Sequence, residues 1–219
     1  NAYQKQTIMR RLLFGCLFII GTIGASAQKN ITLKIDHFLG SNVFAVNSTG
    51  TNNLGHSFKA NRLEYYISEI TLVHDGGQEQ LVSGKYILAN ASSSINESLG
   101  SFSITNLEGI KLSVGVDSAT NHLDPASYNM SHPLAPKSPS MHWGWISGYR
   151  FVAMEGMSGS SLNQPYEIHA LGDNNYHTFT INTAGVVNGN DIDIELQADY
   201  EKALYDIDIS SGLVSHGES

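Results

Sequence analysis

Two early segments of the chain alternate apolar and polar residues with a period of two. Residues 31–35, Ile-Thr-Leu-Lys-Ile, have the pattern of a strand with one buried face. Residues 61–73 form a longer segment that places Leu63, Tyr65 and Ile67 on one parity and leads into the turn sequence Asp-Gly-Gly at 75–77. Because Asp-Gly and Gly-Gly adopt the φ angles of tight turns, these residues predict a long strand followed by a hairpin.

Short strand-like segments separated by polar turns continue through the rest of the chain. They lie at 85–88, 101–104, 109–116, 148–155, 166–170, 176–182 and 191–196. Only 196–204 has the pattern of a helix, and a short helical turn is expected after Ser92. The longest irregular stretch, 118–140, holds four of the five prolines and is expected to be a functional or mobile loop.

Six to nine strands with polar turns between them predict an all-β fold. We expect an antiparallel β-sandwich, similar in size to an immunoglobulin domain, with long loops and at most one or two short helices. No segment repeats with the period of a solenoid or propeller, and no Pro- or Ser-rich linker divides the chain. We therefore expect a single domain over residues 28–219.

Residues 1–27 have the features of upstream sequence followed by a secretory signal peptide. Arg10 and Arg11 precede an apolar run at 12–20, and Ala-Ser-Ala at 25–27 matches a cleavage site. The run is short for a membrane span, which needs about 20 residues. We expect Met9 to be the start codon and cleavage to follow Ala27, which makes the mature protein secreted or periplasmic, or displayed on the outer surface, without a membrane span.

The negative net charge of the chain limits the classes of molecule that it is expected to bind. The chain of 219 residues is 41% apolar and 15% charged, with a net charge of −8. Removal of Lys5, Arg10 and Arg11 with the leader leaves nine basic against twenty acidic residues. Such a protein is not expected to bind nucleic acid or an anionic membrane surface. Cleavage also removes Cys16, the one cysteine, so a soft metal ion would have to be held by His or Met.

Motifs of catalysis are missing from the sequence, whereas histidine is abundant. No GxSxG, Walker, HExxH or GxGxxG pattern occurs, and we expect no enzymatic activity. In an acidic, exported chain without thiols, neutral imidazole is the natural ligand for copper or zinc. Any single histidine is still more often a surface or hydrogen-bonded residue than a ligand. The nine histidines are His37, His56, His74, His122, His132, His142, His169, His177 and His216.

Both tryptophans lie in one aromatic run at 141–151, Met-His-Trp-Gly-Trp-Ile-Ser-Gly-Tyr-Arg-Phe. At strand spacing Trp143 and Trp145 point to one face, and His142 and Gly144 point to the other. By itself the run favours an aromatic seam in the core of a sandwich. The two glycines, Gly144 and Gly148, permit a bulge that would re-aim one tryptophan towards a site.

Six short motifs, taken in their order along the chain, carry a resemblance to a known family. They are Asp-His-Phe at 36–38, Leu-Glu-Tyr-Tyr-Ile-Ser-Glu-Ile-Thr-Leu at 63–72, Val-Gly-Val-Asp-Ser-Ala-Thr-Asn at 114–121, the aromatic run at 141–151, Glu-Gly at 155–156 and Tyr-Glu-Ile-His at 166–169. In this order the chain resembles the MbnP-like family, named for a periplasmic copper-binding protein of methanobactin systems. The resemblance runs from about Ile31 to about His216. It implies a secreted or periplasmic, β-rich domain that binds copper.

The resemblance also implies a site. The family pattern points to His37 and His169 as metal ligands, and Trp143 and Trp145 match a pair of tryptophans of which one, in some members, is oxidised to kynurenine. The implied ligand is copper, as Cu(I) or Cu(II), and the implied partner is a haem-containing protein that oxidises the tryptophan. We favour Trp143 for the site because it adjoins His142.

Two positions depart from the family pattern. His142 stands where relatives have an aromatic residue, which adds it to the candidate ligands, and Ala-Leu-Gly at 170–172 replaces a Gly-Gly. Met141 is a further candidate ligand. If His37 and His169 share one ion, these residues must meet in space although 132 positions separate them.

A second hypothesis of a different class remains open at the level of sequence. The domain could be a non-catalytic, secreted β-sandwich that serves adhesion or protein contact, with structural histidines and tryptophans. Asp117 and Asn121 are interpreted in the same structural way, because an Asp-Ser-x-x-Asn sequence after a strand bonds its own backbone. The metal content of the purified protein separates the two hypotheses.

Overall fold

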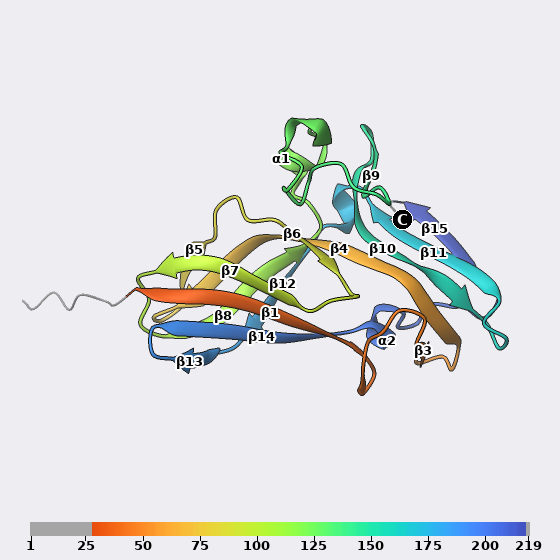
Figure 1. The fold of residues 1–219 in the computed structure, drawn as a ribbon, viewed down its shortest axis with the longest axis horizontal. Coiled ribbons are helices and arrows are strands. Elements are labelled where there is room, and N and C mark those ends of the chain that lie inside the picture. Colours follow the sequence, from red (N-terminus) through yellow and green to blue (C-terminus); the bar gives the residue numbers. More distant parts are fainter. Residues whose placement is uncertain (1–27, 218–219) are drawn as a thin grey trace, which may run out of the picture.

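Two β-sheets packed face to face form the protein (Figure 1), which confirms the expected all-β fold. The computed structural model describes residues 28–217, and the predicted leader at 1–27 lies outside this range. The small sheet has five strands: β1 (Lys29–Leu39), β2 (Asn42–Val43), β7 (Ile95–Phe102), β13 (Val186–Asn188) and β14 (Asp191–Asp199). The large sheet has ten: β3 (Thr49–Thr51), β4 (Ser57–His74), β5 (Gln78–Leu81), β6 (Ile87–Asn90), β8 (Leu107–Val114), β9 (His142–Gly144), β10 (Gly148–Ser158), β11 (Gln164–Leu171), β12 (His177–Asn182) and β15 (Leu213–Gly217).

Within residues 28–217, helical structure is limited to short helices and turns, as expected. They are α1 (Ser118–Asn121), α2 (Tyr200–Ala203) and the 3₁₀ turns η1 (Pro125–Ser127) and η2 (Asp173–Asn175). Only the second half of the helix expected at 196–204 is helical. Strand β14 pairs with β1 as far as Asp199, and the Asp199 side chain then caps α2 by accepting from the Glu201 amide. The turn expected after Ser92 leads into strand β7 instead.

Most strand pairs are antiparallel, but two are parallel. Strand β1 runs parallel to β14, and β11 runs parallel to β15. Both pairs join segments from distant parts of the sequence, which local alternation does not predict. Among residues 28–217, no helix has the length and apolar character needed to cross a lipid bilayer.

Strand β4 contributes to two separate cores. Leu63, Tyr65 and Ile67 alternate into the core between the sheets. Tyr66 points to the opposite face and belongs to a second core on the outer side of the large sheet. A strand that is apolar on both faces needs cover on both faces.

A bulge in β4 keeps the main core continuous. Glu69 has a φ of +46°, and the register of β4 on β8 shifts at this point. By strict alternation Ile70 and Leu72 would share the face of Tyr66. The bulge returns both side chains to the core between the sheets, where they are fully buried.

The irregular segment 118–140 covers the second core. Leu134 is fully buried there, and its carbonyl accepts a hydrogen bond from the Tyr149 hydroxyl at 2.7 Å. Asp117 caps α1, as the turn interpretation predicted, whereas the Asn121 side chain accepts from the Tyr149 amide at 2.8 Å, 28 residues away, and not from its own turn. Much of this long loop is therefore structural cover for the outer face of the large sheet.

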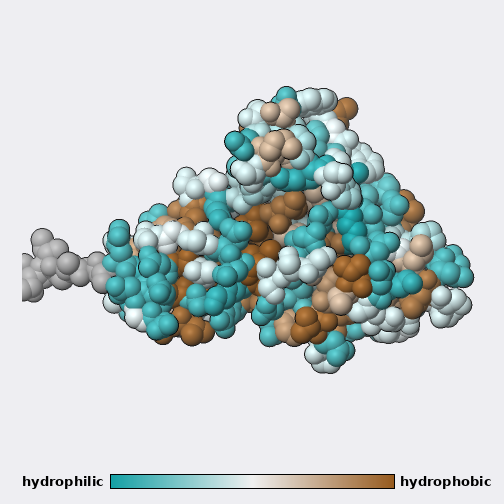
Figure 2. Space-filling view, in the orientation of Figure 1, coloured by the Kyte–Doolittle hydropathy of each residue, from teal (hydrophilic) through white to brown (hydrophobic). Residues whose placement is uncertain are grey.

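The surface is uneven in its polarity. Figure 2 shows apolar side chains recessed in a hollow across the middle of one face, with hydrophilic groups along its rims. Single exposed apolar residues are common on protein surfaces, whereas a contiguous apolar patch with polar rims is typical of a binding surface or groove.

Gly156 is expected to be essential for the register of β10. A Cβ atom at this position would lie 2.0 Å from the Lys59 carbonyl oxygen, next to the register shift of β10 on β4. Gly156→Ala should lower the free energy of unfolding by more than about 2 kcal/mol, because backbone must move to relieve the clash. Urea denaturation measures the effect.

Gly189→Ala is the control for this prediction. Gly189 has a φ of +62°, and a Cβ atom added there would meet no other atom within 4 Å, so only backbone strain of about 1 kcal/mol is expected. Equal losses in the two variants would contradict the proposed clash.

Candidate metal centre

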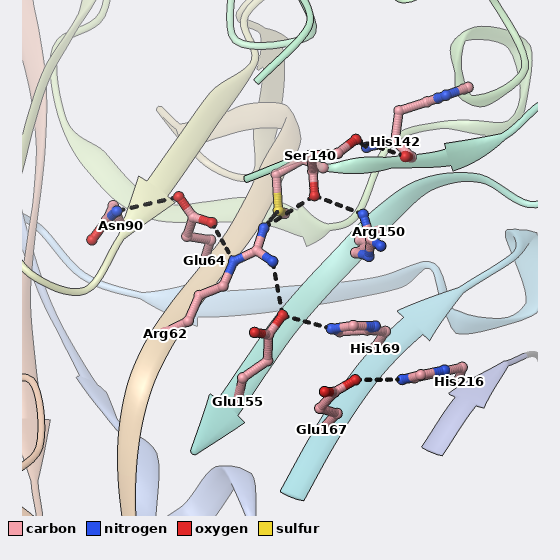
Figure 3. Close-up of polar contacts among 11 residues, drawn as sticks. Arg62, Glu64, Asn90, Ser140, His142, Arg150, Glu155, Glu167, His169 and His216 are labelled. Atoms are coloured by element: carbon pink, nitrogen blue, oxygen red, sulfur yellow. Dashed lines mark hydrogen bonds and ion pairs between the residues drawn. The ribbon is translucent and has the colours of Figure 1, made fainter. Parts of the chain in front are cut away.

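The parallel pairing of β11 with β15 places His169 beside His216. The two residues are register partners, and their rings stack with centroids 4.6 Å apart and an interplanar angle of 10°. Glu167 lies two residues before His169, on the same face of β11, and contacts His216 Nε2 at 3.1 Å. One ring nitrogen from each histidine and one Glu167 oxygen lie within 4.8 Å of one another. Figure 3 shows these side chains on adjacent strands.

A chain of hydrogen bonds fixes the His169 ring. His169 Nε2 lies 2.8 Å from Glu155 Oε1, and the same oxygen accepts from Arg62 Nη1 at 2.7 Å. Arg62 Nε donates to Glu64 at 2.7 Å (Figure 3). Because Arg62 and Glu155 are register partners on β4 and β10, the chain crosses the outer face of the large sheet.

The protonation states follow from these partners. Burial alone would raise the pKa of Glu155, but the hydrogen bond from His169 and the charge of Arg62 bring that pKa below its ordinary value. Burial lowers the pKa of His169, which favours the neutral ring. An ionised carboxylate only accepts, so the assigned proton is on Nε2 and the lone pair is on Nδ1. Within 28–217, His169 Nδ1 is buried and has no hydrogen-bond partner.

The charges around the histidines leave a negative excess. Glu155 and Glu167 are direct register partners on β10 and β11, and like charges in opposed positions repel. With Glu64 they make three carboxylates, against the guanidinium groups of Arg62 and Arg150. A cation bound beside neutral imidazoles would relieve this repulsion.

Strand β9 folds back on β10 and lays Trp143 over the two histidines. The Trp143 ring centroid lies 5.7 Å from that of His169 and 5.0 Å from that of His216. The Arg150 guanidinium stacks on the Trp143 ring at 4.5 Å. Trp143 is 42% exposed, so it forms a wall of the cluster that solvent still reaches.

Trp145 does not join this wall. It is 63% exposed and contacts the His142 ring, with centroids 5.8 Å apart. Gly144 has a φ of +145°, and the β9–β10 register shifts beside Gly148, so the two tryptophans lie in different surroundings. Neither tryptophan is in the core, so the interpretation as an aromatic core seam is wrong for both, whereas Met141, Tyr149 and Phe151 of the same run are buried in the second core.

His142 and Met141 lie outside the histidine cluster. The His142 ring packs edge-on against Tyr149, with centroids 5.1 Å apart, and points away from His169 in Figure 3. Burial lowers the pKa of His142, and its Nε2 is buried without a partner among the described residues. Met141 is buried, and its sulfur accepts a hydrogen bond from Arg62 at 3.2 Å.

The expectation that His37 meets His169 is wrong. His37 follows the parity of Ile31, Leu33 and Ile35 into the core between the sheets, whereas His169 is on the outer face of the large sheet. The large sheet lies between the two histidines. Both His37 ring nitrogens are also engaged, by the Ser93 carbonyl at 2.9 Å and the Tyr200 hydroxyl at 2.6 Å.

Sequence reasoning overlooked most of the residues around His169. The Glu-x-His spacing of Glu167 and His169 puts both side chains on one face of a strand, and this signal was available. Glu155 belongs to the Glu-Gly motif at 155–156, but nothing local indicates that Glu155, Arg62 or His216 lies near His169, because only strand pairing brings them together.

The donor set has the chemistry of a metal site. Imidazole nitrogen suits copper and zinc, and a carboxylate oxygen adds a harder donor that favours a divalent ion. The unpartnered Nδ1 of His169 is a lone pair that no group of the described chain uses. The residues present therefore fit a copper ion.

Comparisons with known proteins agree with the fold. The MbnP family model matches residues 28–216. The solved structure of MbnP from Methylosinus trichosporium is similar with a TM-score of 0.55 and 12% identity, over 88% of this chain and 82% of that chain. At this identity the likeness concerns the fold alone, and no curated protein matches the chain. The family match covers nearly all described residues, and the chain belongs to the MbnP family.

Proposed function

We propose that the protein binds a copper ion at the His169–His216–Glu167 cluster and stores or transfers it outside the cytoplasm. Membership of the MbnP family is consistent with a copper-related role. The observation that carries the proposal is the group of two imidazoles and a carboxylate within 4.8 Å, beside a buried ring nitrogen with no partner in the described chain. The predicted leader supports export, and the proposed role is binding and not catalysis.

The geometry also indicates how the site would respond to the ion. The lone pairs of two stacked rings lie in two nearly parallel, separate planes, so one ion can lie in both ring planes only if at least one ring turns about its Cβ–Cγ bond. Glu155 restrains His169, whereas His216 is held by the more exposed Glu167. We therefore expect His216 to be the ring that moves.

Trp143 is the residue we propose for oxidation to kynurenine. It is the tryptophan beside the histidines, and a kynurenine at this position would add an amine and a carbonyl to their surroundings. Its 42% exposure leaves the ring open to the haem-containing partner that the family resemblance implies.

The alternative, an adhesion module with structural histidines and tryptophans, explains less. Buried polar atoms normally have partners, and His169 Nδ1 has none within the described chain. Structural tryptophans are normally buried, and both tryptophans are exposed. Copper binding accounts for the unpartnered atom directly.

Removing either clustered histidine should weaken copper binding strongly. His169→Ala and His216→Ala each delete one of two imidazole donors, and we expect a loss of more than about 100-fold in affinity, beyond the effect typical of outer-shell residues. Competition titration with a copper chelator measures it. His177→Ala, at an exposed histidine of β12, is the control and should match the parent. Parental affinity in both cluster variants would refute the site.

Glu155→Gln should reduce copper affinity by about 10- to 100-fold without removing a donor atom. A glutamine amide both donates and accepts, so it no longer confines the proton of His169 to Nε2. Glu79→Gln, which removes a carboxylate paired with Lys111 elsewhere on the large sheet, is the control. If Glu155→Gln binds copper as the parent does, Glu155 does not position His169.

His37→Leu should affect stability and spare copper binding. The change leaves the Tyr200 hydroxyl and the Ser93 carbonyl without their buried partner, at a cost of about 1–3 kcal/mol. Thermal unfolding and copper titration are measured on the same preparation. A folded His37→Leu protein that has lost its copper affinity would restore His37 as a ligand.

A further inference from the structure

A cavity of about 570 Å³ lies between the two sheets, on the other side of the large sheet from the copper cluster. Its walls come from β1 and β14 of the small sheet, from β4, β8 and β12 of the large sheet, and from α2. Cavities of 300 to 1,000 Å³ with mostly apolar walls are the usual size of small-molecule sites.

The cavity opens to solvent between two edge strands, β14 of the small sheet and β12 of the large sheet, that no further strand covers there in the described structure. Strand β13 pairs with β14 only at 191–193, so in the described structure no strand pairs with the outer edge of β14 from Ile194 to Asp199. Figure 1 shows β13 alongside one end of β14 only. Strand β12 is the last strand of the large sheet on this side. The two open edges form the mouth of the cavity.

The side chains that line the cavity are mostly apolar. Leu112 and Ile181 line it from the large sheet, and Leu196 lines it from β14. Tyr200 also lines it, but its hydroxyl is already bonded to His37 Nδ1 inside the core. With this polar atom satisfied internally, the interior suits a hydrocarbon chain.

The mouth carries one basic group, Lys202 on α2. Its side chain is 80% exposed and lies 3.6 Å from Asp199. The Asp199 carboxylate is held by the amides of Gly40 at 2.9 Å and Glu201 at 3.2 Å, where it caps α2. Both amides bond Asp199 Oδ1, whereas Lys202 lies near Oδ2, so Asp199 keeps its amide partners if the exposed ammonium group turns towards an anion at the mouth.

We propose that this cavity binds a single-chain alkyl carboxylate, with the chain between the sheets and the carboxylate at Lys202. This site is separate from the copper cluster and does not depend on it. Each methylene buried from water contributes about a fourfold gain in affinity. Affinity should therefore rise steeply from octanoate to dodecanoate.

Titration of the ¹⁵N-labelled protein with dodecanoate, below its micelle concentration, tests the proposal. Amide signals of 179–181 and 196–203 are expected to shift in a saturable manner, and dodecylammonium should bind more weakly than dodecanoate. Absence of saturable shifts in these segments would overturn the proposal. Equal binding of dodecylammonium and dodecanoate would overturn the role of Lys202.

Variants assign the binding to the cavity. Ala198→Trp fills it and should abolish dodecanoate binding, and Phe179→Asp charges its wall and should have the same effect. Val187→Asp, at an exposed apolar residue of β13 outside the cavity, is the matched control. Lys202→Glu should weaken binding about two- to fivefold, the range for an exposed ion pair.

The outcomes separate this site from the copper site. Dodecanoate affinity that survives both Ala198→Trp and Phe179→Asp in folded protein overturns the cavity as the binding site. Copper affinity should be unchanged in all four variants, so a failure of copper binding in the parent leaves this proposal standing on its own result.

Discussion

The apolar side chains on both faces of β4 are the constraint from which the rest of the architecture follows. One face, with Leu63, Tyr65 and Ile67, is buried against the small sheet. The other face, with Tyr66, needs a second cover, and the chain supplies it with the long segment 118–140. A plain two-layer sandwich would leave this face in water. The outer face of the large sheet is therefore partly enclosed, and His169 is buried there beside the exposed Glu167 and His216.

The candidate copper cluster lies on that same outer face, next to the second core. Ala153, in the second core, is the register partner of His169, and Glu155 follows two residues later on β10. Arg62 on β4 supplies the countercharge to Glu155 on β10. Glu155 in turn bonds His169 on β11, so the three strands are linked by one chain of polar contacts. The opposite face of the same sheet lines an apolar cavity. The large sheet thus separates the polar face that carries the proposed copper cluster from the apolar face that lines the cavity.

Local alternation predicted the fold class and much of β1 and β4, because period-two patterns report directly on burial. The parity of His37 with Ile35 indicates a place in the core, against the metal site that the family resemblance implies for it. The resemblance pointed to His169 and Trp143, which lie together in the candidate cluster, and to Trp145, which lies outside it. It did not identify His216, because the parallel pairing of β15 with β11 depends on the whole fold and leaves no trace in neighbouring residues. The contact of Glu155 with His169 could not be predicted either, because it depends on the pairing of β10 with β11.

The central claim is that one copper ion is held between β11 and β15. An anomalous difference map, recorded at the copper absorption edge from crystals of the copper-loaded protein, tests it most directly. The account predicts one strong peak within bonding distance of a His169 and a His216 ring nitrogen, about 2.0 to 2.1 Å by analogy with other imidazole-bound metals. A sole peak at His37 or at His142, with the His169 and His216 rings still stacked, would contradict it.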